Sequence, residues 1–241
     1  MENNSLFHVS QEFKVDAELL SVEQNEVGQL NGTYVCNWQD VKKEKFRTIL
    51  QEINQYVFVK PEILDKNFTI FSRFYHSAKT ATPVNLKIPE LIETKTGHTM
   101  IVLEGSYWRM QKYIENSICI EKPESLKEVL SATEALASFH LKSLNFPINN
   151  LTNPIPGFQE VVGRVELLKK AMKEDSVSRV RLVKPEIKFI ENYIDVVKDY
   201  MNLYSSCPLR VTHGDPKFNN FLFNKDTREA FALIDFDTLM P

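Results

Sequence analysis

The stretch Val211–Phe223 decides the fold, and it reads VTHGDPKFNNFLF. The residues Leu209–Thr212 predict a strand, a polar loop follows, and Phe221–Phe223 predicts a second short strand. The loop has the spacing His-x-Asp-x-x-x-x-Asn. A further apolar run, Ala230–Ile234, predicts another strand and is followed by Asp-Phe-Asp. Two strands that each deliver an acidic residue at one end are typical of a magnesium–phosphate site.

Phosphoryl transfer explains why these residue types stand at this spacing. Moving a phosphoryl group from ATP to a hydroxyl needs a carboxylate beside the attacking oxygen and oxygen ligands for Mg²⁺. Asp215 suits the first role, while Asn220 and Asp235 suit the second, because Mg²⁺ takes few protein ligands and keeps several waters. Lys217 is expected to place a positive charge against the transferring phosphate. Asp237 is expected to assist the metal or the loop geometry.

A purely structural interpretation stands beside this one. An Asp-Pro turn with neighbouring Asn residues is common hairpin chemistry, and an Asp after a strand often caps a turn. His213 is expected to brace the loop by hydrogen bonds rather than to transfer a proton. Either motif alone fits this interpretation equally well. Both motifs together, in order and each at a strand end, favour the phosphate site.

The same residues carry a family resemblance. The segment Val211–Pro241 resembles the aminoglycoside phosphotransferase and choline kinase superfamily, and its part IDFDTLMP is most similar to the N-acetylhexosamine 1-kinase branch. Ile49–Asn54, Tyr107–Arg109 and Ile155–Phe158 agree with that branch. The resemblance implies an α+β, two-lobed protein-kinase-like fold with a small antiparallel-sheet N-lobe and a mainly helical C-lobe. It also implies ATP-dependent phosphorylation of a small-molecule hydroxyl, in that branch the anomeric hydroxyl of an N-acetylated sugar.

This resemblance sets the expected domains. We expect an N-lobe at 1–106, a hinge at 107–122 and a C-lobe at 123–241. Pro241 follows Asp235 closely, whereas members of the superfamily continue through further C-lobe helices that supply acceptor contacts. The sequence is therefore expected to be truncated, with an incomplete C-lobe and sugar site.

The first two predicted strands, Glu18–Gln24 and Thr33–Trp38, flank a glycine-containing loop. A loop of this kind suits ATP phosphates, because glycine lets backbone N–H groups approach an anion. The candidate nucleotide contacts are Gly28, Asn31, Gly32 and Thr33. Asn-Gly is also a common hairpin turn. Alone it favours a plain hairpin, and only the downstream acidic motifs favour a nucleotide loop.

The third predicted strand, Phe46–Ile53, contains no lysine. Protein kinases carry on this strand a lysine that pairs with the ATP phosphates. Arg47 and Gln51, which alternation puts on one side, are the candidates to replace it, and a solvated strand face is the alternative we favour. A helix is predicted from Pro61. Its apolar stripe comprises Ile63, Leu64, Phe68, Phe71 and Tyr75.

Two more strands are predicted in the N-lobe, Ile88–Thr94 and Thr99–Glu104, and a further strand, Tyr107–Ile114, is expected to lead into the hinge. Tyr107, Trp108 and Arg109 on the last of them are candidate substrate contacts, because aromatic faces suit sugars and bases. The alternative is a strand packed in the N-lobe core, which for Trp108 is equally favoured.

The remaining chain predicts helices. A long helix follows Pro123, a loop covers 146–158, and two more helices cover 160–173 and 185–205. The long helix is expected to bury its apolar stripe, with His140 as a hydrogen-bonded core residue. That stripe comprises Leu126, Val129, Leu130, Thr133, Leu136, Ala137, His140, Leu141 and Leu144.

Composition limits the functional classes. The chain has 241 residues, 29 basic against 32 acidic side chains and a net charge of −3, which gives no reason to expect nucleic acid or an anionic membrane as partner. Three widely spaced cysteines fit a reduced, cytoplasmic protein. No signal peptide or membrane span is predicted.

The leading hypothesis is an ATP- and Mg²⁺-dependent kinase of a small-molecule hydroxyl, in particular a sugar such as an N-acetylhexosamine. The same chemistry on choline, an aminoglycoside, homoserine or another sugar stays open, because the motifs do not encode the acceptor. A non-catalytic, kinase-like nucleotide-binding module is the alternative from another class, motivated by the absent strand lysine and the early end of the chain. Retention of Asp215, Asn220 and Asp235 together favours the enzyme.

Overall fold

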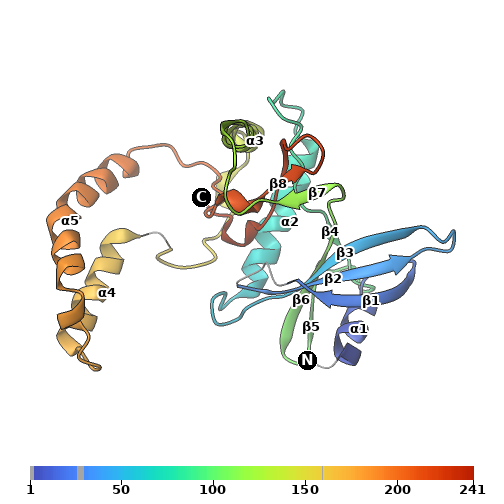
Figure 1. Cartoon of the computed structure of the whole chain (residues 1–241), viewed down its shortest axis with the longest axis horizontal. Coiled ribbons are helices and arrows are strands. Elements are labelled where there is room, and N and C mark those ends of the chain that lie inside the picture. Colours follow the sequence, from blue (N-terminus) through green and yellow to red (C-terminus); the bar gives the residue numbers. More distant parts are fainter. Residues whose placement is uncertain (1–2, 26–29, 159) are drawn as a thin grey trace. The chain divides into compact units, whose positions relative to one another are not determined.

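The computed structural model of the chain describes residues 3–25, 30–158 and 160–241 (Figure 1). These residues fold into two compact units. The larger unit comprises Met1–Pro154 and Arg210–Pro241, and the smaller unit comprises Ile155–Leu209. Within the described ranges, every helix is too short or too polar to cross a membrane. The lobes expected at 1–106 and 123–241 stay a prediction.

An antiparallel sheet opens the larger unit, with the strand order β1-β2-β3-β6-β4 and with β5 also paired to β6 (Figure 1). The strands predicted at 18–24, 33–38, 46–53, 99–104 and 107–114 are confirmed as members of this sheet. The bounds are β1 (Glu18–Gln24), β2 (Gly32–Gln39), β3 (Lys45–Glu52), β4 (Leu91–Ile92), β5 (Met100–Leu103) and β6 (Ser106–Lys112).

The two faces of this sheet differ in character. The register aligns Thr33, Gln51 and Arg109 in one row across β2, β3 and β6. Successive side chains of a strand point to opposite faces, so Trp108 lies on the other face from Arg109. There it is 1% exposed and packs in a core with the helix α1 (Asn3–Gln11). The sheet therefore presents a polar row on one face and buries its apolar side chains on the other.

The helix α2 (Pro61–Ser77) links the sheet to the Asp235 loop. It begins at Pro61, as predicted, because proline suits the first helical turn. Its predicted apolar stripe is confirmed in that Leu64, Phe68, Phe71 and Tyr75 are buried. The ring of Phe236 lies 5.2 Å from the ring of Phe68 and 5.9 Å from that of Phe71, between centroids. Aromatic packing thus fixes the loop that follows Asp235 against α2.

A second antiparallel sheet carries the two acidic motifs, in the order β7-β8-β9. The predicted strands 221–223 and 230–234 are confirmed. The bounds are β7 (Ser117–Cys119), β8 (Phe221–Asn224), β9 (Ala230–Leu233), with the 3₁₀ turns η1 (Ile148–Asn150), η3 (Phe218–Asn220) and η4 (Phe236–Thr238). The helix α3 (Leu126–Ser143) packs against β9. It begins after Ser125, whose hydroxyl accepts the N–H of Glu128 at 3.3 Å.

The buried face of α3 differs from the prediction. Leu126 is 72% exposed, Leu130 is 54% exposed, and His140 is also exposed. The helix instead buries the opposite face, which consists of Glu128, Ser131, Ala132, Ala135, Ser138, Phe139 and Ser143. Small side chains let the helix approach closely, and two of the serines accept backbone N–H groups: Ser131 from Ala230 at 2.8 Å and Ser138 from Val84 at 2.9 Å. The prediction of a leucine-lined core face with a buried His140 is wrong.

Two predicted strands are also corrected. The segment Leu209–Thr212 forms no strand but a single bridge between Thr212 and Met240. Of the predicted strand Ile88–Thr94, only Leu91–Ile92 pairs with β6. Pro89 has no N–H to donate, so it cannot continue a sheet ladder.

The smaller unit is a pair of helices, α4 (Val161–Glu174) and α5 (Lys184–Ser205), joined through the turn η2 (Val180–Leu182). Both helices were predicted, at 160–173 and 185–205. Val165 and Ile187 are the residues they bury. The connection starts at Asp175, in the left-handed region at φ 32°, whose carboxylate accepts the backbone N–H groups of Arg179 and Val180 at 2.8 and 3.1 Å.

Candidate active site

The two acidic motifs are joined by backbone contacts. Thr212 and Met240 exchange N–H···O bonds of 2.8 and 3.2 Å, and the Thr238 hydroxyl donates to the His213 carbonyl at 2.8 Å. Gly214 has φ +83°, and a Cβ at this position would lie 2.4 Å from the Thr238 carbonyl oxygen. Glycine is therefore required by both its backbone conformation and the close approach. The Asp215 loop and the Asp235 loop are one structural element.

His213 braces this element, as predicted. Its side chain is 2% exposed, its ring lies 4.8 Å from that of Phe236, and its Nε2 is 2.9 Å from the Ile234 carbonyl oxygen. Burial lowers the pKa of His213 to about 4. The imidazole is therefore neutral at neutral pH, and Nε2–H donates to Ile234, immediately before Asp235.

Asp215 and Asn220 lie on the first loop. The Asp215 side chain is 38% exposed, and its Oδ2 lies 3.1 Å from Lys217 Nζ. Asn220 is buried, and its Nδ2 donates to the Asp215 carbonyl at 2.8 Å. This bond fixes the amide with its oxygen on the opposite side. The Asn220 carbonyl also accepts the N–H of Ile234 at 2.9 Å, so Asn220 and Asp235 are held by adjoining backbone.

Asp235 has two unusual properties. Its backbone is left-handed, at φ 68° and ψ 62°, which is uncommon for a non-glycine residue. Desolvation, followed by the charge of Asp237, raises the pKa of Asp235 to about 6. A carboxylate that is costly to ionise in its surroundings is stabilised by a bound cation.

The donors on these loops fit Mg²⁺. Among the described residues, no three His, Cys, Asp or Glu side chains gather as a closed protein metal site would need. Mg²⁺ is commonly held by one or two protein oxygens together with phosphate and water. The carboxylate of Asp235 and the amide oxygen of Asn220 have this chemistry.

Asp237 takes part in a different contact. Its side chain is 3% exposed, as is that of Arg109, and its Oδ1 lies 2.6 Å from Arg109 Nη1. That pair is a close ion contact without good hydrogen-bond angles. Oδ2 accepts from Asn31 Nδ2 at 2.6 Å. Both carboxylate oxygens are thus engaged, so of the two roles expected for Asp237 this arrangement supports loop geometry rather than metal binding.

The polar row of the sheet holds Arg109 in place. Arg109 Nε donates to Gln51 Oε1 at 3.0 Å, and Gln51 Nε2 lies 3.4 Å from Thr33 Oγ1. Asn31 is held in turn, because its Oδ1 accepts the N–H of Asn54 at 2.9 Å. We refer to Asn31, Gln51, Arg109 and Asp237 as the Arg109 network.

Other predicted site residues lie apart from this network. Arg47 pairs with Glu115 and lies over the Tyr113 ring, so it does not occupy the position of a strand lysine. Trp108 is in the core on the opposite sheet face. Tyr107 is partly exposed. Gly32 pairs with Glu52 across the sheet, and Gly28 lies outside the described residues.

Sequence reasoning missed Asn67 of α2. It is 1% exposed, and its Nδ2 donates to the carbonyls of Leu239 and Thr152 at 3.1 and 2.7 Å. The available signal was a polar residue at helical spacing between Leu64 and Phe71 on the buried stripe. Buried amides are normally hydrogen-bonded, so Asn67 marks where the end of the Asp235 loop docks on α2.

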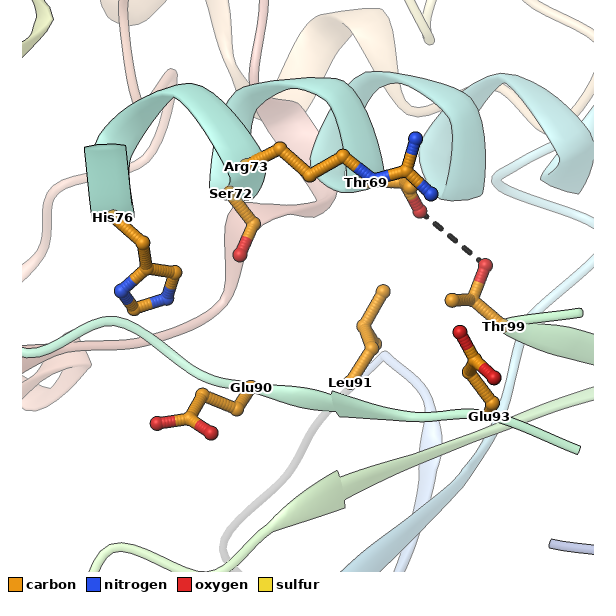
Figure 2. Close-up of a pocket in the computed structure, with 8 residues that line it drawn as sticks. All are labelled: Thr69, Ser72, Arg73, His76, Glu90, Leu91, Glu93 and Thr99. Carbon is orange, nitrogen blue, oxygen red and sulfur yellow. Dashed lines mark hydrogen bonds between the residues drawn. The ribbon is translucent and has the colours of Figure 1, made fainter. Parts of the chain in front are cut away.

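A cavity of about 370 Å³ lies elsewhere in the larger unit, between α2 and β4 (Figure 2). Its walls are polar, and a hydrogen bond of 3.3 Å between Thr69 and Thr99 crosses one end. The lining residues are Thr69, Ser72, Arg73, His76, Glu90, Leu91, Glu93 and Thr99. It includes no residue of the two acidic loops, so we do not assign the chemistry to it.

Comparison with known proteins identifies the family. A sequence model of the phosphotransferase enzyme family, which includes the aminoglycoside phosphotransferases, matches residues 39–241. The chain belongs to this family. The superfamily resemblance carried by Val211–Pro241 is thereby confirmed.

Solved structures share the fold at low identity. An aminoglycoside phosphotransferase from Alicyclobacillus acidocaldarius has a TM-score of 0.54 and 14% identity, over 97% of this chain and 65% of its own. A spectinomycin phosphotransferase in complex with ADP and spectinomycin has a TM-score of 0.64 and 14% identity, over 100% and 70%. An aminoglycoside phosphotransferase from Streptomyces rimosus in complex with ADP and streptomycin has a TM-score of 0.53 and 12% identity, over 100% and 78%. The predicted kinase-like α+β fold is confirmed, and the chain spans 65% of the length of the first of these structures.

Proposed function

We propose that the protein transfers the γ-phosphoryl group of ATP to a hydroxyl of a small molecule. The observation that carries this proposal is the joined pair of acidic loops. They hold Asp215 half-exposed, Asn220 with its amide fixed, and Asp235 in surroundings that raise its pKa to about 6. Family membership supports the same chemistry.

Each residue has a role in the proposed reaction. Asp215 orients the acceptor hydroxyl and accepts its proton as the oxygen bonds to the γ-phosphorus and the bond to the ADP oxygen breaks. Lys217, 3.1 Å from Asp215, is close enough to balance charge on the transferring group. Asn220 and Asp235 would hold Mg²⁺, which when bound neutralises charge on the phosphate oxygens. His213, neutral and buried, keeps the two loops in register.

For the acceptor, we propose a sugar of the N-acetylhexosamine type, phosphorylated at the anomeric hydroxyl. The support is the similarity of Ile234–Pro241, IDFDTLMP, to that branch of the superfamily. Relatives with the same fold are named for other acceptors, namely spectinomycin and macrolides. Choline, aminoglycosides and other alcohols are therefore included as competing acceptors in the test.

A nucleotide-binding module without catalysis is the second candidate. It is favoured by one observation, which is that β3 carries Gln51 and no lysine in the row that faces the Asp235 loop. Such a module would bind Mg²⁺–nucleotide and transfer nothing.

The experiment is a phosphoryl-transfer assay with the whole natural reading frame expressed, so that any residues after Pro241 are present. The acceptors are N-acetylgalactosamine, N-acetylglucosamine, galactose, choline and kanamycin, and the control variant is Asp215→Asn. Transfer to an N-acetylhexosamine that is lost in the variant supports both reaction and acceptor. Transfer to another acceptor retains the reaction and overturns the acceptor. Magnesium-dependent ATP binding without transfer to any acceptor favours the binding module.

A further inference from the structure

The Arg109 network connects three parts of the larger unit that are distant in sequence. Asn31 follows the loop between β1 and β2, Arg109 lies on β6, and Asp237 lies two residues after the proposed metal ligand Asp235. The Asn31 and Arg109 contacts to the Asp237 carboxylate are both 2.6 Å. The network therefore ties the start of β2 directly to the segment that would bind the metal.

Burial makes this connection specific. The side chains of Arg109 and Asp237 are each 3% exposed, so neither charge is hydrated and each depends on the other. Gln51 Oε1 accepts from Arg109 Nε, so the guanidinium is held by contacts at two of its nitrogens. By contrast, Arg47, which lies on β3 like Gln51, pairs with Glu115 in a contact whose side chains are 39% and 51% exposed. It offers a matched arginine–carboxylate contact with no link to the acidic loops.

We propose that Arg109 is a positioning residue, which acts through Asp237 to hold Asp235 for Mg²⁺ and, by way of the Asp237–Asn31 contact, to fix the start of β2 against the Asp235 loop. This inference rests on the proposed function. Protein kinases carry a lysine on the strand that corresponds to β3, which here carries Gln51. The buried cation beside Gln51 is Arg109 on β6, and its guanidinium contacts Asp237 of the Asp235 loop. Its effect is therefore on the magnesium-dependent part of nucleotide binding. A lysine that touches phosphate would instead strengthen nucleotide binding with or without the metal.

The test measures ADP affinity by calorimetry, with Mg²⁺ and with EDTA, for the wild type, Arg109→Lys, Asp235→Asn and the control Arg47→Lys. We expect Arg109→Lys to weaken the magnesium-dependent affinity by about 10–100-fold, as is usual when a group that orients a metal ligand is removed. We expect its affinity in EDTA to stay within about twofold of wild type, and Arg47→Lys to match wild type in both. Equal loss with and without Mg²⁺ in Arg109→Lys would overturn the positioning role in favour of direct phosphate contact. No loss in either condition would also overturn it.

The double variant Arg109→Met/Asp237→Leu guards against misfolding. Replacing both members of a buried ion pair by apolar residues of similar size is often tolerated by the fold, whereas breaking one member is not. We expect this variant to fold and to lose magnesium-dependent affinity to the same extent as Arg109→Lys. A folded double variant with wild-type affinity would mean that the pair is structural only.

Amide hydrogen exchange separates the two inferences, because it needs no ligand. In Arg109→Lys we expect faster exchange at Met240, whose N–H bonds Thr212, and at Asn54, whose N–H bonds Asn31. If the two amides exchange faster in Arg109→Lys but the wild type binds no Mg²⁺–ADP, the network is supported and the proposed function is overturned. Unchanged exchange at both amides would overturn the network whatever the binding result.

Discussion

Gly214→Ala tests the joining of the two acidic loops most directly. An alanine Cβ at this position would lie 2.4 Å from the Thr238 carbonyl oxygen and 2.8 Å from its Cβ. To remove this steric overlap the two loops would have to separate, which would break the Thr212–Met240 bridge and the Thr238–His213 hydrogen bond. The φ of +83° adds a backbone cost of about 1–2 kcal/mol for any residue with a Cβ. Overpacking adds about 1–3 kcal/mol.

The expected loss in the free energy of unfolding is therefore about 2–5 kcal/mol, the sum of these backbone and packing costs. Gly97→Ala is the matched control, because Gly97 has φ +85° and a Cβ there would meet nothing within 4 Å. The Gly97→Ala variant should lose only the backbone cost of about 1–2 kcal/mol in its free energy of unfolding. Urea unfolding followed by tryptophan fluorescence suits both variants, since Trp38 and Trp108 both belong to the larger unit. If Gly214→Ala were no less stable than Gly97→Ala, the close approach of the loops would be refuted.

Three further predictions concern stability. Burial lowers the pKa of His213 from 6.5 to about 4, so the unfolded chain takes up this proton first and stability falls with pH below 6.5. Between pH 7 and pH 4.5 the loss from this group is about 2.5 kcal/mol, and His213→Gln should remove that part of the pH dependence in urea titrations at both pH values. Trp108→Ala should cost about 3–5 kcal/mol, because the ring is core. An unfolding free energy within 1 kcal/mol of wild type would instead return Trp108 to the candidate ligand contacts. Asn67→Ala leaves the buried carbonyl of Leu239, and also the carbonyl of Thr152, without their side-chain donor. It should cost about 1–3 kcal/mol, whereas exposed Lys66→Ala should change stability by less than about 0.5 kcal/mol; equal effects of the two variants in denaturant titrations would contradict the docking role of Asn67.

Local patterns predicted the acidic loops but not the Arg109 network. Asp215, Asn220 and Asp235 stand within one short stretch, so strand ends and spacing were enough to group them. Asn31 and Asp237 are 206 residues apart in sequence and meet only because the sheet and the loop pack together. Alternation correctly put Arg47 and Gln51 on one side of β3. It could not tell which end of the strand faces the acidic loop, and that end carries Gln51.

The long helix α3 illustrates a second limit. Its leucines lie at helical spacing, and its alanines and serines form another stripe on the opposite side. Hydrophobicity alone favours the leucines as the buried face. In the structure, close packing against β9 selects the small residues, and Ser131 gives a buried N–H of that strand its acceptor. The need of buried backbone N–H groups for an acceptor thus helps to select the buried face of α3, and hydrophobicity alone does not predict this face.

The charges around Asp235 relate the network to the proposed metal site. Asp237 has Arg109 as its counter-charge at 2.6 Å, and both are buried. Asp235 forms no such ion pair with any residue that the structure describes. Burial is the main cause that raises the pKa of Asp235 to about 6, and the charge of Asp237 adds to it, while Arg109 and Lys217 act to lower it. One buried cation beside two neighbouring carboxylates leaves negative charge uncompensated. A divalent cation bound by Asp235 would supply the missing charge. In the proposed site the Arg109–Asp237 pair therefore has an electrostatic function as well as a positioning one, because it neutralises the second carboxylate and leaves Asp235 as the carboxylate that needs the metal.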